Sequence, residues 1–309
     1  MSSGLLDLIT KVDNVPLDFQ QNFHPYYRLF VTPNPHPHGY IHPKTISSLS
    51  WPPSFAIDHT ARTVTLHTPH TAEAINAAFQ QVIDQAIESS AFPSLQIHSE
   101  SFLIPGLSNF PSSIVHIERF ASSLFGIATR GAHLTAYLPA TASSPLKIWV
   151  ARRSRNLIAH PSLLDSSVAG GVKATDSPLE CILAESHEEA SLSREFVANN
   201  VRAVGTLTLA NRNPKTELFH AEILYVYDLE MPADVIPVPE DGEVEEFMLM
   251  ESGEVIRRML AGEFKPNVCG IMIDFFIRHG IITPDNESDY VDICSRLHRI
   301  LPMPTKPDQ

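Results

Sequence analysis

The stretch LAESHEEASL, Leu183 to Leu192, contains the three glutamates Glu185, Glu188 and Glu189. At about 100° per residue of an α-helix, Glu188 lies about 60° to one side of Glu185 and Glu189 about 40° to the other. The three carboxylates therefore share one narrow face. Like charges at these spacings repel by about 0.2–0.5 kcal/mol per pair, and no lysine or arginine of the same helix offsets them. The pattern indicates either a solvated acidic face or a site for an external cation.

The residues just upstream define where this helix begins. Ser177 is a preferred N-cap residue, and Pro178 fits the first helical position. Glu180 falls in the first turn, where the helix dipole favours an acid. An apolar stripe beside the carboxylates completes an amphipathic helix; its members are Leu179, Ile182, Leu183, Ser186 and Ala190.

Composition limits the kinds of partner. The chain has 309 residues, with 22 basic against 35 acidic side chains and a formal net charge of −13. It contains no Lys/Arg-rich run, so nucleic acid and anionic membranes are not expected as partners. A phosphate-bearing small molecule remains compatible with an acidic protein, because metal ions can mediate its binding. The oligomeric state stays open.

The N-terminus, the apolar runs and the cysteines bear on the cellular compartment of the protein. We expect no signal peptide, because no basic segment followed by a long apolar run opens the chain. We expect no transmembrane helix, since no apolar run reaches about 18 residues. The three cysteines are few and far apart, at positions 181, 269 and 294. Reduced thiols and a cytoplasmic location are the simpler interpretation.

The pattern along the chain predicts two domains. Residues 1–115 are expected to form a small α+β domain, with short strands near 28–32 and 39–41, a hairpin over 54–68, and a helix after Thr71. Residues 116–309 mix strands and helices without a regular βαβ repeat. An α+β domain, or an α/β/α sandwich with a mixed sheet, is the expected architecture.

Two glycines, Gly170 and Gly171, lie between a strand-like run and the acidic helix. A glycine loop followed by a helix with clustered glutamates resembles the Nudix box, G-x5-E-x7-R-E-U-x-E-E-x-G-U, where U is apolar. Gly170 takes the place of the first glycine, and the three glutamates take their box positions. The sequence departs from the general box in three places: Asp176 stands for Glu, Ala184 for Arg, and Ser191 for the last Gly.

The fuller stretch AGGVKATDSPLECILAESHEEASL, residues 169–192, is similar to the box of Nudix proteins related to the domain fused to fungal thiamine pyrophosphokinase. In that subfamily the serine at 191 is expected. The resemblance extends from about residue 24 to 303 and includes IERFASSLFGIATRGAHLTAY upstream and YVYDLEMP, GEFKPN and IDFFIRHGIITPDNESDY downstream.

The resemblance implies a Nudix α/β/α sandwich that hydrolyses a diphosphate with the help of Mg²⁺ or Mn²⁺. By position, Glu185, Glu188 and Glu189 are the expected metal ligands, with Glu188 or Glu189 acting as catalytic base. The backbone carbonyl of Gly170 is a further candidate ligand. Carboxylates are the hard oxygen ligands that these ions prefer.

The resemblance implies thiamine diphosphate or its oxidised analogues as substrate, but the residues alone do not distinguish these from nucleotide sugars or isoprenyl diphosphates. Four departures from the subfamily fall near the expected pocket. Ala184 replaces a Lys or Arg, Thr175 a loop glycine, Leu157 a lysine and Ser162 a glycine. Two alternatives follow: a Nudix fold repurposed for a non-hydrolytic reaction of specialised metabolism, or a ligand-binding protein without turnover.

Substrate-binding candidates outside the box are Arg152, Glu245 and Lys265. Glu245 or the adjacent Glu246 is a candidate for the additional acid that many Nudix enzymes recruit from outside the box, although a solvated acidic loop is the favoured explanation. Lys265 and Asn267, in the stretch GEFKPN, are candidates for contact with substrate. A structural turn before the next helix explains this stretch at least as well.

Other chemistry-bearing residues are better explained structurally. His36, His38 and His42 form a zinc-like cluster without a fourth ligand, so a loop is favoured. His187 lies on the far side of the acidic helix and is expected at the surface. Cys181 lacks a neighbour that would lower its pKa, so a packed thiol is expected. No G-x-S-x-G serine elbow is present.

Overall fold

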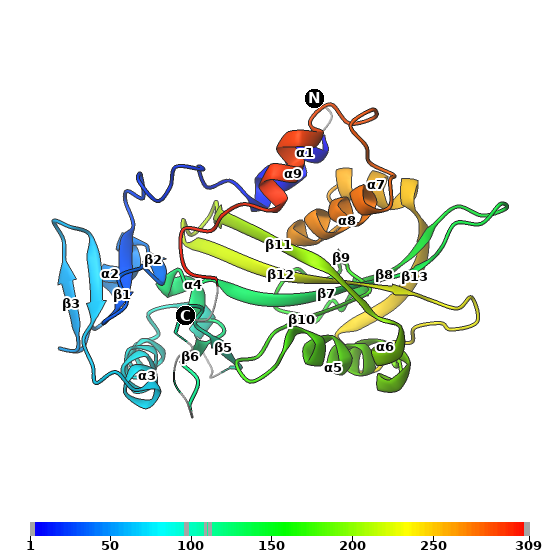
Figure 1. Ribbon diagram of the computed structural model, residues 1–309. Coiled ribbons are helices and arrows are strands. Elements are labelled where there is room, and N and C mark those ends of the chain that lie inside the picture. The colour runs from blue at the N-terminus through cyan, green and yellow to red at the C-terminus, as the bar shows by residue number, and fades with distance from the viewer. Residues whose placement is uncertain (1–3, 96–98, 108–109, 111–112, 306–309) are drawn as a thin grey trace.

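The computed structural model describes residues 4–95, 99–107, 110 and 113–305. Figure 1 shows an N-terminal part in blue and cyan beside a larger part built on a long twisted sheet. The N-terminal sheet has the order β2-β1-β4-β3, and α3 packs on it. Its elements are β1 (Tyr27–Val31), β2 (Gly39–Ile41), α2 (Pro43–Ser48), β3 (Phe55–Asp58), β4 (Thr63–Leu66) and α3 (Ala72–Glu88).

The predicted elements of this part are confirmed. The hairpin is β3 paired antiparallel with β4. Helix α3 begins after Thr71, whose side chain accepts a hydrogen bond from the Ala74 amide at 3.2 Å. A Thr N-cap followed by apolar residues at helical spacing was sufficient to locate it.

The N-terminal core continues beyond the four-stranded sheet. The hairpin of β5 (Ser101–Leu103) and β6 (His116–Glu118) and helix α4 (Ser122–Phe125) contribute to the same core, which ends with Ile127. A division between residues 115 and 116 remains a proposal, and this packing favours a boundary nearer residue 127. Helix α1 (Leu5–Val12) instead packs with the C-terminal helices.

The larger part is a mixed sheet between two helical layers. The strand order is β11-β12-β7-β8-β13, with β10 paired to β7 and β9 to β8, and the β12–β7 pair is parallel. Its strands are β7 (Thr129–Leu138), β8 (Lys147–Arg153), β9 (Leu164–Asp165), β10 (Val168–Gly171), β11 (Arg202–Arg212), β12 (Phe219–Glu230) and β13 (Val244–Glu251).

Each face of this sheet has its own helices and its own core (Figure 1). One face carries α5 (Pro178–Ala190) and α6 (Arg194–Asn200). The other carries α1 together with α7 (Ser252–Leu260), α8 (Pro266–Arg278) and α9 (Tyr290–Leu297). The expected α/β/α sandwich with a mixed sheet is confirmed. No helix of the described residues is long and apolar enough to cross a membrane.

An aromatic cluster lies where the two parts meet. Phe19 stacks on Phe219 with ring centroids 5.1 Å apart, and Tyr26 and Tyr40 pack against them edge-on or tilted. All four rings are almost fully buried. Because Phe219 begins β12 and Tyr40 belongs to β2, this cluster joins the N-terminal sheet to the sandwich.

Candidate functional site

The acidic helix forms as predicted. In α5 the Ser177 hydroxyl accepts a hydrogen bond from the Glu180 amide at 3.1 Å, and Pro178 occupies the first turn. The helix ends at Ser191 in the left-handed conformation, with φ of 53°. The Ser191 hydroxyl donates to the Val238 carbonyl at 2.9 Å, which fixes the end of the helix.

The three glutamates share one face but differ in depth. Glu188 is exposed, Glu185 is half-buried, and Glu189 is only 6% exposed. The Ala169 amide donates a hydrogen bond to Oε2 of Glu189 at 3.0 Å. This bond ties α5 to β10 and fixes the direction of the buried carboxylate.

The two glycines of β10 allow neighbouring side chains to pack directly against the strand backbone. A Cβ atom on Gly170 would collide with the carboxylate of Glu185, and one on Gly171 would come within 2.6 Å of the Phe102 ring. Phe102 belongs to β5, so the N-terminal hairpin packs directly on the loop before α5. The Ala174 amide adds a hydrogen bond to the Ser101 carbonyl at 2.8 Å. The N-terminal part therefore supports the loop that precedes the acidic helix.

Burial and mutual repulsion make two of the carboxyl groups reluctant to ionise. Burial, followed by the charges of Glu188 and Glu243, raises the pKa of Glu185 to about 7. Burial, followed by the charge of Glu185, raises the pKa of Glu189 well above its usual range. A bound cation favours the ionised form of such carboxyl groups, so this arrangement suits a metal ion.

A small cavity adjoins Glu189 on the side away from the helix. Its lining brings together residues from β8, β9, β10, α5 and β13 and from the loops before β10 and β13: Ala151, Arg153, Asp165, Ser166, Ala169, Glu189, Glu243 and Val244. Besides Asp165, Glu243 is an acid from outside α5 that lines this cavity and acts on Glu185 and Glu189. It precedes β13 in a loop, where no sequence periodicity singles it out.

The cation at this cavity is Arg153 and not its neighbour Arg152. Arg153 donates to Oδ2 of buried Asp165 at 2.8 Å, and the Lys265 ammonium lies 3.4 Å from the same oxygen. Burial alone raises the pKa of Asp165, but Lys265, His133 and Arg153 together hold it below its usual value. Lys265 therefore does not line the cavity itself. It acts as a charge partner of Asp165, which does.

The other predicted substrate residues face elsewhere. Arg152 pairs with Glu246 at 2.7 Å, and Glu245 pairs with Arg155 at 2.5 Å. Asn267, in the first turn of α8, is hydrogen-bonded to the half-buried Glu222 of β12. Neither Arg152 nor Glu245 lines the cavity beside Glu189, because adjacent residues of a strand point to opposite faces.

Comparison with known proteins agrees with the box. A NUDIX domain matches residues 134–267. The uncharacterized protein YJR142W of Saccharomyces cerevisiae is 31% identical over 98% of this chain and 92% of its own length. This chain contains a Nudix domain.

Two plant proteins carry the activity in their names. Nudix hydrolase 20, chloroplastic, and Nudix hydrolase 24, chloroplastic, both of Arabidopsis thaliana, are 33% and 31% identical to this chain over 66% of its length. The chain spans 55% and 57% of those two proteins. The Nudix domain and these relatives support a Nudix-type hydrolase and leave its substrate open.

The Nudix box has its usual donor chemistry here, although the side chains do not converge. Across the described ranges, no three His, Cys, Asp or Glu side chains form a group that would hold a metal ion as they stand. The donors still fit Mg²⁺ or Mn²⁺, because Glu185, Glu188, Glu189 and Glu243 are hard oxygen ligands on one side of the sheet. Glu188 and Glu243 are exposed, whereas Glu189 is buried.

The loop before the Nudix helix carries a cation that acts on Glu185. Ala184 provides no charge, but Lys173 lowers the pKa of Glu185 and is itself paired with Glu100 at 3.2 Å. Glu100 lies next to β5, so this pairing again involves the N-terminal part. The sequence argument considered only charges within the helix and therefore missed Lys173.

The remaining candidates have structural roles. The thiol of Cys181 is buried, and burial raises its pKa to about 12, as expected for a packed thiol. His187 is exposed as predicted. His42 caps α2 through Nδ1, and His38 is buried against the Pro105 carbonyl. The histidine-rich segment is therefore part of the N-terminal packing.

The two replaced glycines behave differently. Ser162 has a φ of 62°, whereas Thr175 is not among the residues with positive φ, so the glycine replaced at Thr175 is not required by the backbone conformation. Thr175 Oγ1 donates to Asp176 Oδ1 at 2.9 Å, a contact that fits an ordinary loop residue. Of these two positions, only Ser162 has a left-handed backbone.

Exchanging each of these residues for glycine should therefore give effects of opposite sign. Ser162→Gly removes left-handed strain and should raise the free energy of unfolding by about 1 kcal/mol. Thr175→Gly increases the conformational entropy of the unfolded chain and relieves no strain, so it should lower the free energy of unfolding by about 0.5–1 kcal/mol. Urea denaturation of the two variants beside the parent protein measures both. Effects of the same sign would contradict the assignment.

Proposed function

We propose that this protein hydrolyses the diphosphate linkage of a small organic diphosphate with Mg²⁺ or Mn²⁺ as cofactor. The observation that carries the proposal is the buried carboxylate of Glu189, which the Ala169 amide orients, beside Glu185, for which Gly170 leaves room. A solvated acidic face would not bury one of its acids and orient it by a backbone hydrogen bond. This observation favours a metal site over the alternative of a surface charge cluster.

Each residue then has a specific task. Glu185, Glu188 and Glu189 would hold the metal, with the Gly170 carbonyl as a further ligand, and Glu188 or Glu189 would accept the proton of the attacking water. The metal, when bound, would neutralise the diphosphate and lower the pKa of that water.

The residues around the carboxylates prepare this site. The Ala169 amide keeps Glu189 in place, and Asp165 holds the charges of Arg153 and Lys265 on the far side of the cavity. We propose Glu243 as the acid recruited from outside the box, in place of Glu245 or Glu246, because only Glu243 lies at the cavity.

Thiamine diphosphate and its oxidised analogues are the substrates that we propose first. The support is the similarity of residues 169–192 to the thiamine-associated Nudix box, including the serine at 191. The products would be the monophosphate and inorganic phosphate. Nucleoside and isoprenyl diphosphates are the alternatives to be tested beside them.

A phosphate-release screen with Mg²⁺ or Mn²⁺ tests the activity across thiamine, nucleoside and isoprenyl diphosphates. We expect turnover of at least one class, and a loss of roughly a hundredfold or more in the Glu188→Gln variant. This exposed side chain can be changed without disturbing the core. If the parent protein cleaves nothing faster than Glu188→Gln, the hydrolase proposal fails.

A repurposed or purely binding Nudix protein is the second candidate, and the absence of a cation at position 184 favours it. The double variant Ala184→Lys, Leu157→Lys in the same screen separates the two. A large gain in hydrolysis would show that the parent protein is tuned away from this reaction. An unchanged or lower rate would indicate that Lys173 already supplies the charge.

A further inference from the structure

A second hollow lies away from the Nudix box, where the N-terminal sheet meets the C-terminal segment. It has a volume of about 820 Å³, within the size range of small-molecule sites. One wall comes from Arg28, His36 and Tyr40, and the other from Thr208 and residues 299–305. It shares no lining residue with the cavity beside Glu189.

The charge of this hollow is opposite to that of the whole chain. Two arginines line it and no acidic residue does, although the chain carries a net charge of −13. An anionic ligand would therefore meet complementary charge here, without the metal ions that the acidic box requires.

Arg28 has no charge partner among the described residues. No carboxylate pairs with it, and its Nε is buried without a hydrogen-bond partner. The guanidinium is instead held over the rings of Phe23 and Phe30, at 4.6 and 5.6 Å from their centroids. Aromatic faces fix the plane of a guanidinium and leave its N–H edge available to an anion.

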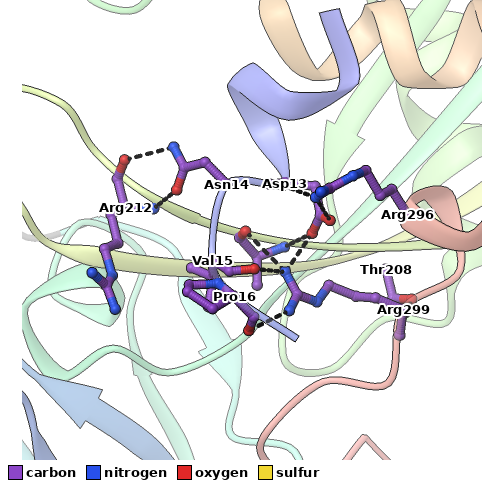
Figure 2. A network of polar contacts seen from close by, with 9 residues as sticks. Asp13, Asn14, Val15, Pro16, Thr208, Arg212, Arg296 and Arg299 are labelled. Carbon is purple, nitrogen blue, oxygen red and sulfur yellow. Dashed lines mark hydrogen bonds and ion pairs between the residues drawn. The ribbon is translucent and has the colours of Figure 1, made fainter. Parts of the chain in front are cut away.

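Arg299, which lines the hollow, is held by several polar contacts. Figure 2 shows Arg299 held by Asp13 at 2.7 Å and by the carbonyls of Val15 and Pro16 at 2.9 and 3.1 Å. The Thr208 hydroxyl donates to the Arg299 carbonyl. The charge of Arg299 is therefore already paired with Asp13. Arg28 is the lining arginine without a carboxylate partner among the described residues.

The opposite rim is apolar. Leu301, Met303 and two prolines contribute to the lining, and Ile300 at the edge is 92% exposed. Such a wall suits a ligand with a hydrocarbon or aromatic body beside its charged group.

We propose that this hollow binds a small organic anion, a phosphate or carboxylate group joined to an apolar body, with Arg28 as the residue that binds the anionic group. Because the lining comes from both parts of the chain, the ligand would bridge them. The site is independent of the proposed hydrolysis and needs no metal ion.

Calorimetric titration of the full chain in EDTA tests the site, because chelation removes metal-dependent binding at the Nudix box. The probes are phenyl phosphate, benzoate and inorganic phosphate. We expect phenyl phosphate or benzoate to bind, and inorganic phosphate to bind more weakly because it lacks the apolar body. Binding of phenyl phosphate alone identifies a phosphate site, and binding of both identifies a general anion site.

Variants then assign the binding to this hollow. Arg28→Gln should weaken binding by about tenfold or more, since hydrogen bonds to charged groups are strong, and Arg28→Lys should weaken it less. Ile300→Glu places a negative charge on an exposed position and should also weaken binding without affecting folding. Arg155→Gln, at an exposed arginine near β13, is the matched control and should bind as the parent does. If no probe binds the parent, or if Arg28→Gln and Ile300→Glu both bind normally, the proposal is wrong.

Discussion

Glutamine in place of Glu189 is expected to lower kcat/KM for the best diphosphate substrate by roughly a hundred- to ten-thousandfold, the usual range for loss of a positioned acid or base. Glutamine keeps the volume of the side chain, and its oxygen can still accept the bond from the Ala169 amide, now 3.0 Å long. The substitution therefore removes charge from a buried position that is only 6% exposed, and leaves the packing of α5 against β10 in place. Steady-state phosphate release measures the effect.

The matched control is Glu195→Gln, at an exposed acid in the first turn of α6. It removes the same charge a few residues further along the chain and should leave kcat/KM unchanged within about twofold, in line with the small effects of surface substitutions. Mn²⁺ affinity, followed by electron paramagnetic resonance, should fall in Glu189→Gln and not in the control. Equal metal affinity and equal activity in both variants would exclude Glu189 from the site.

The parts of this site that the sequence could predict depend on local signals. The cap at Ser177, the proline at 178 and the 3.6-residue spacing are all contained in α5 itself, so the helix and its acidic face followed from them. The difference in burial between Glu188 and Glu189 did not follow. It depends on β10, which approaches the helix only because Gly170 has no side chain.

Residues that come from other elements were missed for a physical reason. Arg153 lies on the same face of β8 as Trp149 and Ala151, and Trp149 belongs to the core beneath α5. Strand periodicity therefore contained the information, but choosing Arg153 over Arg152 required knowing which face α5 covers. Glu243 and Lys173 lie in loops, whose positions depend on the assembled fold.

The same limit applies to the junction between the two parts. Asp13 and Arg299 are separated by 286 positions, and neither lies in a motif that predicts pairing. Their contact exists because α1 packs with α8 and α9 on one face of the sheet, which brings the segment after α1 beside the segment after α9.

Asp13→Ala is expected to lower the free energy of unfolding by about 3–5 kcal/mol, because it leaves buried charge without its partner. The Asp13 side chain is fully buried and accepts from Arg299 at 2.7 Å and from the Ala210 amide at 3.1 Å, with Arg296 at 3.4 Å (Figure 2). Urea denaturation followed by circular dichroism measures the change.

Two further variants separate charge from hydrogen bonding at this position. Asp13→Asn keeps an acceptor for the Ala210 amide but loses the charge, so its destabilisation should be smaller than that of Asp13→Ala. Asp234→Ala, at an exposed aspartate, should change stability by no more than about 0.5 kcal/mol. If Asp13→Ala matched this control, the Asp13–Arg299 pair would contribute nothing to stability. If Asp13→Ala lowers the free energy of unfolding strongly and Asp13→Asn lowers it little, the hydrogen bond from the Ala210 amide of β11 accounts for the effect. The carbonyls of Val15 and Pro16 would then stabilise the charge of Arg299 without Asp13.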